Sequence, residues 1–233
     1  MKSTQYNQSL TPKKASKGIE IITENANSLL ADAELLFANN RYERTVTLSI
    51  LAIEEIGKIP ILRSILLEDG QKDLNKVWKN FRTHQEKNWG LFFSDYIKDG
   101  AENIDDLKFM FIDDKSKDKV ENLKQLSIYT DYFKGDKWSI PSKVIDEKLA
   151  KTILKQAQFF VNQQNSHLTT EKELKLWIKH MKPVWKKDMS LMKAGMVKFY
   201  EEALELEILD SSIDIEKVQR FINYESDKNT DNS

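Results

Sequence analysis

TVTLSILAIEEIGKIPILRSILL, residues 45–67, is the most hydrophobic stretch of the chain. Its apolar residues cover more than one face of a helix, so we expect this helix, at about residues 42–67, to be the most buried element of the fold. Pro60 lacks a backbone donor and crowds the carbonyl of Ile56, which predicts a kink between these two residues.

Charged residues and a glycine interrupt this apolar run at AIEEIGK, residues 52–58. Glu54 and Lys58 are four residues apart with the acid first, the favourable order for an ion pair along a helix. Buried charge is costly unless it is paired, so Glu54, Glu55 and Lys58 need partners on another element. Gly57 would let that element approach closely. The alternative is an exposed pair on a helix that is apolar elsewhere.

The rest of the chain also favours helices, because only 7 Gly and 4 Pro occur in 233 residues. Apolar residues recur at helical spacing from Ser16 to Phe37, and Asn39-Asn40 ends this helix so that it pairs antiparallel with the next one. Further helices are expected at about 74–89, 118–127, 142–164, 171–182, 188–209 and 213–223.

Three local signals add detail to this pattern. Thr170 and Glu173 form a capping box at the start of one helix, and Pro183 interrupts that helix. The sequence around Lys134-Gly135-Asp136 indicates a hairpin-like turn. We therefore predict an all-α bundle with extra C-terminal helices and an irregular insertion around residues 90–140.

The predicted organisation is one helical domain at residues 15–224, between a flexible N-terminus at 1–14 and a disordered tail at 225–233. The net charge of -1 indicates no particular partner, and the absence of Cys excludes disulfides and thiolate sites and suits a reducing compartment. We expect a cytoplasmic protein, because neither a signal peptide nor a membrane-spanning stretch is recognisable.

Candidate catalytic residues occur in NFRTHQEK, residues 80–87. Asn80, His84 and Lys87 share one face of the predicted helix, and Arg82 lies on a neighbouring face. Histidine is the side chain most easily tuned to move protons near neutral pH, although a histidine beside aromatic residues is often structural. Three histidines without clustered carboxylates, and no Gly-rich phosphate loop, predict neither a metal site nor a cofactor.

Three segments together resemble the AbiV family of abortive-infection proteins, which belongs to the HEPN superfamily. They are ENANSLLADAELLFANNRYERTVTLSILAIEEIGK at 24–58, WKNFRTHQEK at 78–87 and IYTDYFKGDKWSIP at 128–141. The resemblance covers about residues 20–165. It implies a HEPN-like helical bundle that forms a homodimer.

The resemblance also implies a role in bacterial defence against phage. A phage-encoded protein would activate the effector, and host protein synthesis would stop. Many HEPN domains are metal-independent ribonucleases with an Arg and a His separated by a short spacer. In this chain Arg82 and His84 are separated by a single residue, and the AbiV pattern combines EEIGK with FR-x-H-x-x-K instead.

For the site, the resemblance implies that the AIEEIGK segment faces the FRTHQEK segment. The catalytic candidates are Glu54, Glu55, Lys58, Arg82, His84 and Lys87. His84 would act as general acid or base, and Arg82 and Lys87 would stabilise charge on the phosphorus. Lys124 and Tyr129 are candidate RNA contacts. Two alternatives stay open: an inhibitor that binds RNA or the ribosome without cutting, and a helical protein-interaction module.

Overall fold

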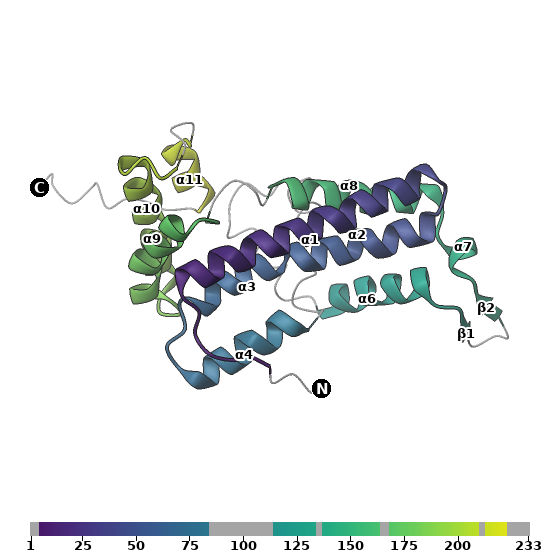
Figure 1. The fold of residues 1–233 in the computed structure, drawn as a ribbon, viewed down its shortest axis with the longest axis horizontal. Helices are drawn as coiled ribbons and strands as arrows, with labels where there is room; N and C mark the ends of the chain where they lie inside the picture. Colours follow the sequence, from purple (N-terminus) through teal and green to yellow (C-terminus); the bar gives the residue numbers. More distant parts are fainter. Residues whose placement is uncertain (1–4, 84–113, 134–136, 164–167, 210–212, 223–233) are drawn as a thin grey trace, which may run out of the picture.

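The computed structural model describes residues 5–83, 114–133, 137–163, 168–209 and 213–222. Their secondary structure is helical apart from one small hairpin, which confirms the all-α prediction (Figure 1). Most of the expected irregular insertion, the hairpin turn and the C-terminal tail lie outside the described residues.

Helices α1 (Pro12–Ala38) and α2 (Tyr42–Ile56) form the predicted antiparallel pair. The Thr11 side chain caps α1 by accepting a 3.3 Å hydrogen bond from the backbone N–H of Lys14. Asn40 has a φ of 59°, the left-handed conformation that asparagine tolerates, and it turns the chain between the two helices as predicted.

The long helix predicted at residues 42–67 is divided at Gly57 into α2 and α3 (Lys58–Ile65). The break falls in the region predicted for the kink. Pro60 occupies the third position of α3, where the missing backbone donor breaks no hydrogen bond of the helix. Gly57 has a φ of -61°, a conformation that any residue adopts, so its backbone does not require glycine.

The remaining elements of the bundle follow the predicted order. They are α4 (Gln71–Arg82), α6 (Asp114–Ile128), β1 (Asp131–Phe133), β2 (Lys137–Ser139), α7 (Pro141–Val144) and α8 (Glu147–Gln163). The two strands pair antiparallel, with Tyr132 opposite Trp138, which confirms the hairpin. The single helix expected at 142–164 is divided before α8, where Asp146 accepts a 2.8 Å hydrogen bond from the backbone N–H of Leu149.

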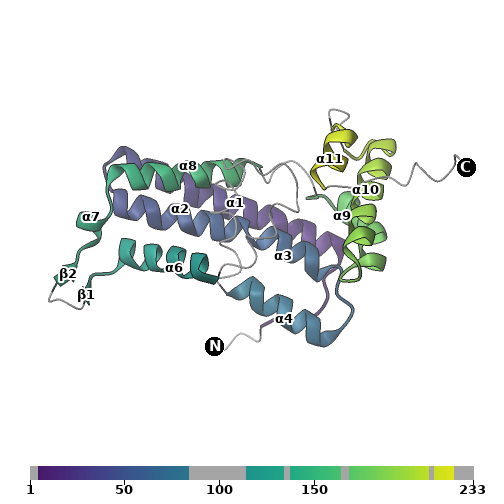
Figure 2. The same ribbon diagram turned by 180° about the vertical axis from the view of Figure 1, so that it is seen from behind.

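Helices α1, α2 and α8 lie side by side along the long axis (Figures 1 and 2). Helix α6 packs against α2, α3 packs against α1 and α2, and α4 packs against α3. Their facing apolar residues form one large core. Its most buried members are Ala15, Ile19, Ala26, Ala33, Val46, Ile50, Ala52, Ile53, Ile59, Ile65, Ala150, Ala157, Val161 and Leu174. The prediction that the segment at 45–67 is the most buried is consistent with this core, to which α2 and α3 contribute along their whole length.

The C-terminal elements lie at one end of the long axis and surround a second, smaller core (Figure 1). They are α9 (Glu171–Met181), the 3-10 helix η3 (Lys182–Val184), α10 (Met189–Glu205) and α11 (Ile215–Phe221). Leu174 of α9 belongs to the larger core, and Arg63 of α3 donates a 3.1 Å hydrogen bond to the carbonyl of Leu168. Burial lowers the pKa of Arg63 to about 10, so this link stays charged at neutral pH.

The segment before α1 contacts α4. The Tyr6 ring meets the Trp78 ring edge-on at a centroid distance of 5.7 Å, and the Trp78 indole N–H donates to the carbonyl of Gln8 at 2.9 Å. The segment predicted to be flexible, residues 1–14, therefore includes these contacts and the first turn of α1, which begins four residues before Ser16. No helix in the described ranges is long and apolar enough to cross a membrane.

Candidate functional site

The AIEEIGK segment carries two glutamates with different surroundings. Glu54 points into the bundle and is only 3% exposed. Lys124 of α6 reaches it with a distance of 2.9 Å between Nζ and Oε1, and the same ammonium group lies 2.8 Å from Glu121 Oε2. Lys124 is itself 7% exposed. A charge of opposite sign from another helix thus compensates the buried carboxylate, as the cost of burial requires.

The protonated form of Lys124 is stabilised by these neighbours. Burial alone would lower the pKa of the Lys124 ammonium group, but the hydrogen bonds that it donates to Glu121 and Glu54 outweigh burial and raise the pKa above its usual value. At neutral pH the group is therefore a cation, and Lys124 is held in the bundle with both carboxylates.

Glu55 forms the other pair of this segment, with Lys58. The alternative of an exposed Glu54–Lys58 pair is wrong, because Glu54 is buried against Lys124, and α2 ends at Ile56 before the chain turns at Gly57. The Glu55–Lys58 pair is partly exposed, with 16% of the Glu55 side chain and 23% of the Lys58 side chain accessible. It is the part of the segment that a ligand can reach.

The pair with Lys58 also brings the segment against the end of α4. The Lys58 ammonium group lies 5.7 Å from the centroid of the Phe81 ring. Phe81 directly precedes Arg82, the last residue of α4. The expected approach of AIEEIGK to the FRTHQEK segment is therefore present at Phe81. His84 and Lys87 lie outside the described residues, and their roles stay predictions.

Arg82 is directed toward the N-terminal segment. Its guanidinium group lies 5.2 Å from the centroid of the Trp78 ring, donates a 3.3 Å hydrogen bond to the carbonyl of Trp78 and contacts the carbonyl of Tyr6. The contacts of Arg82 with Tyr6 and Trp78 hold it against the segment before α1. Stabilisation of a phosphorus centre by Arg82 would require it to leave these contacts.

The two predicted RNA contacts differ in accessibility. Tyr129, next to the end of α6, has 58% of its surface exposed, whereas Lys124 is buried in the bundle. Tyr129 is thus open to solvent and Lys124 is held by Glu54 and Glu121. Among the described residues, no group of three His, Cys, Asp or Glu side chains could hold a metal ion.

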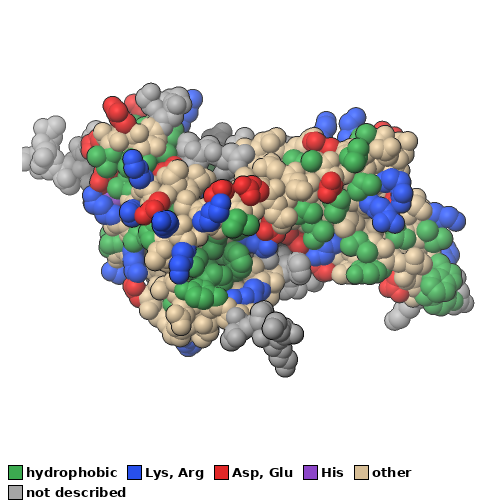
Figure 3. Space-filling view, viewed as in Figure 1, with side chains coloured by type: hydrophobic (Ala, Val, Ile, Leu, Met, Phe, Trp, Pro, Cys, Tyr) green, Lys and Arg blue, Asp and Glu red, His purple; other side chains and the backbone are tan. Residues whose placement is uncertain are grey.

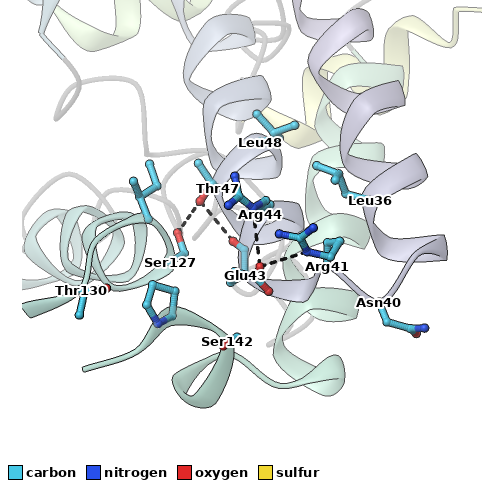
Figure 4. Close-up of a pocket in the computed structure, with 12 residues that line it drawn as sticks. Leu36, Asn40, Arg41, Glu43, Arg44, Thr47, Leu48, Ser127, Thr130 and Ser142 are labelled. Carbon is cyan, nitrogen blue, oxygen red and sulfur yellow. Dashed lines mark hydrogen bonds and ion pairs between the residues drawn. The ribbon is translucent and has the colours of Figure 1, made fainter. Parts of the chain in front are cut away.

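A groove at the opposite end of α2 was not identified from the sequence (Figure 4). It has a volume of about 740 Å³ and combines polar with apolar side chains. The residues that line it are Leu36, Asn40, Arg41, Glu43, Arg44, Thr47, Leu48, Ser127, Ile128, Thr130, Pro141 and Ser142. The sequence does carry one signal: Arg41 and Arg44 lie at the start of α2, where the helix dipole disfavours cations.

The geometry of this groove is fixed by a few polar contacts. The Nε atoms of Arg41 and Arg44 lie 3.5 Å and 3.8 Å from one oxygen of Glu43. On the facing side, the hydroxyl oxygens of Thr47 and Ser127 are 2.7 Å apart, which joins α2 to α6. Two guanidinium groups thus share one carboxylate at the wall of an open groove.

The bundle of α1 to α8 is a helical domain of the kind expected in the HEPN superfamily. A family model described as AbiV, of the HEPN type, matches residues 14–162, which make up more than half of the chain. The chain belongs to the AbiV family. The C-terminal elements α9 to α11 lie outside the matched residues. A search of the curated proteins found no match, and a search of the solved structures found none either.

Proposed function

We propose that this protein is an abortive-infection effector that stops host translation on phage infection by cutting RNA without a metal ion. Membership of the AbiV family supports the defence role. The observation that carries the catalytic part is the position of the accessible Glu55–Lys58 pair against Phe81, at the end of α4. His84 follows two residues after Arg82, the last residue of this helix.

The proposed reaction uses the RNA as its own nucleophile. A ribose 2′-hydroxyl attacks the adjacent phosphorus, the bond to the 5′-oxygen breaks, and the products are a 2′,3′-cyclic phosphate and a 5′-hydroxyl. His84 takes the proton from the 2′-hydroxyl or returns one to the leaving oxygen. Lys58, Arg82 and Lys87 supply positive charge for the phosphorus centre, and Glu55 positions Lys58.

The protein is proposed to act in the cytoplasm as a homodimer that a phage-encoded protein activates. A second function is favoured by one observation: the contacts of Arg82 with Trp78 and Tyr6 direct it away from the Glu55–Lys58 pair. In that case the protein would bind RNA or the ribosome and block translation without cutting.

The test is made in infected cells, because infection is the proposed trigger. Cells express the wild type, His84→Ala or Glu55→Gln at matched soluble levels, total RNA is run on a gel, and protein synthesis is followed by isotope incorporation. Glu20→Gln is the matched control, since Glu20 also pairs with a lysine three residues away but lies exposed on α1.

The catalytic proposal expects discrete RNA fragments with the wild type and Glu20→Gln, and none with His84→Ala. Glu55→Gln should reduce cutting about tenfold or more. Intact RNA in every strain, with translation nevertheless stopped by wild type and His84→Ala, would exclude the nuclease and support the inhibitor that binds without cutting. Translation that continues in all infected strains would contradict both functions.

A further inference from the structure

The β1–β2 hairpin exposes two aromatic rings that pair with each other. Tyr132 and Trp138 are opposite residues of the two strands, and their ring centroids are 5.1 Å apart. They are 52% and 66% exposed. A tryptophan with two thirds of its surface in water is unusual in a folded protein, and exposed aromatic clusters commonly mark binding surfaces.

Cations lie in the hairpin, in α7, and in the groove that Thr130 and Pro141 line on either side of the hairpin. Arg41 and Arg44 stand at the wall of the groove, and at least half of each side chain is exposed. Lys137 of the hairpin and Lys143 of α7 are exposed as well. Arg41 and Arg44 lie at the start of α2, where the helix dipole stabilises acids and disfavours cations. Within the described groove and hairpin, the cations are Arg41, Arg44 and Lys137, and the acids are Glu43 and Asp131.

The groove and the hairpin are adjacent along the chain. Thr130 of the groove directly precedes β1, and Ser127 and Ile128 end α6 just before it. Pro141 and Ser142 of the groove follow β2 after Ile140. The chain therefore leaves the groove into the hairpin and returns to it. The space-filling view shows hydrophobic side chains next to blue cationic ones at the end of the molecule that carries the hairpin (Figure 3).

We propose that this end of the bundle binds single-stranded RNA, with bases stacked on Trp138 and Tyr132 and phosphates on Arg41 and Arg44. The inference rests on the proposed function, since it names the surface that would hold the RNA. Aromatic rings beside a cationic groove are the combination that binds unpaired nucleic acid, because every base has a face to stack. The hydroxyl groups of Thr130 and Ser142 can donate to phosphate oxygens.

Charge favours RNA over a second copy of the chain as the occupant. A symmetric dimer formed through this surface would place the same patch of both copies face to face. The four cations of one copy, on Arg41, Arg44, Lys137 and Lys143, would then approach the four of the other copy. A polyanion instead meets all of them with opposite charge.

The experiment measures binding of the full-length protein to a fluorescent 2′-O-methyl oligouridine of about 12 nucleotides, which matches the span of one stacking surface and cannot be cut by 2′-hydroxyl attack. The variants are Trp138→Ala and Arg44→Ala. Their matched controls are Phe221→Ala and Arg220→Ala, because both residues are exposed on α11 at the opposite end of the molecule (Figure 1).

We expect Trp138→Ala to weaken the Kd about tenfold, as the loss of one stacked base does. Arg44→Ala should also weaken binding and should reduce the dependence of the Kd on salt by about one ion. Both controls should bind as the wild type does, and a duplex of the same length should bind more weakly. Equal binding by all variants, or no binding by the wild type, would overturn the proposal.

Sedimentation of the same proteins tests the alternative occupant. If Trp138→Ala dissociates a dimer while its affinity for RNA is unchanged, the surface joins two copies and the proposal is overturned. Failure here is separable from failure of the proposed function: RNA fragments in infected cells together with unchanged binding by both variants would refute this surface alone. Weakened binding by the variants without arrest of translation would refute the proposed function alone.

Discussion

Two buried glutamates, one in α2 and one in α9, show two ways of keeping a carboxylate out of water. Glu54 is 3% exposed and Glu173 is 4% exposed. Glu54 meets the ammonium group of Lys124, which comes from a helix 70 residues further along the chain. Glu173 instead accepts hydrogen bonds from its own loop.

The donors to Glu173 are three consecutive backbone N–H groups. Those of Leu168, Thr169 and Thr170 lie 3.1, 3.0 and 2.7 Å from its carboxylate oxygens. Burial alone would raise the pKa of Glu173, but the bonds from Thr170, Thr169 and Leu168 together lower it below the usual value. The Glu54 carboxylate thus depends on a partner from another helix, whereas the Glu173 carboxylate depends on backbone N–H groups within the same six residues of the chain.

The largest effect is expected when the tertiary pair is broken. Glu54→Leu leaves the buried ammonium group of Lys124 with Glu121 as its remaining acid, and we expect a loss of about 3 kcal/mol in the free energy of unfolding. Unfolding in urea measures it. The double variant Glu54→Leu/Lys124→Leu should recover most of the loss, because two apolar side chains replace both charges.

An exposed pair provides the control for this cycle. Glu20→Leu removes the partner of Lys17 on the exposed surface of α1 and should leave the urea midpoint close to that of the wild type. A loss with Glu54→Leu as small as that of the control would show that the buried pair does not hold α6 on α2.

Glu173→Ala should cost less, about 2 kcal/mol, because the three N–H groups lose a charged acceptor, but Thr169 is partly exposed and Thr170 is exposed, so water can reach their N–H groups. The contrast with Glu54 is sharpest in which further substitution can restore the lost stability. The three nearest donors are backbone N–H groups, which only proline would remove, so Glu173→Gln is the substitution expected to restore part of the stability. Thermal unfolding compares the three proteins, and full stability in Glu173→Ala would refute the local account.

The pH dependence separates the two glutamates further. Because the pKa of Glu173 is lower in the folded protein than in the unfolded chain, its contribution is complete above the unfolded pKa, about 4.5, and is lost as the pH falls through the lower folded value. Urea unfolding of the wild type between pH 6 and pH 3 should therefore show a steeper loss than that of Glu173→Gln. Parallel curves would contradict this assignment.

These comparisons explain which parts of the structure the sequence could predict. The turn at Asn39-Asn40, the capping box at Thr170 and Glu173 and the hairpin near Trp138 all depend on residues close together in the chain, and all three are confirmed. The conformation of such segments is set by their own hydrogen bonds and dihedral angles, so a short window of sequence contains the cause.

The candidate site was less predictable, because its contacts join residues that lie far apart in the chain. The partner of Glu54 is Lys124, and no pattern near either residue indicates the other. The alternative of an exposed Glu54–Lys58 pair assumed an unbroken helix, which the turn at Gly57 interrupts. The groove beside Arg44 is formed by segments from both ends of the bundle sequence, so it becomes visible only when α2, α6 and α7 are placed together.

The smallest effect is expected at the hydroxyl group of the capping box. Thr170 Oγ1 accepts a 3.3 Å hydrogen bond from the backbone N–H of Glu173, while the Glu173 side chain makes the reciprocal bond to the Thr170 N–H. Thr170→Ala removes only the first bond and should cost about 1 kcal/mol, whereas Thr170→Ser, which keeps an oxygen there, should cost a few tenths. Hydrogen exchange of the α9 amides gives the sharpest measurement, because the cap belongs to the first turn of that helix. If Thr170→Ala were to match Glu173→Ala in its effect, the two halves of the capping box would act as one unit, and the carboxylate could not be regarded as independently held by its loop.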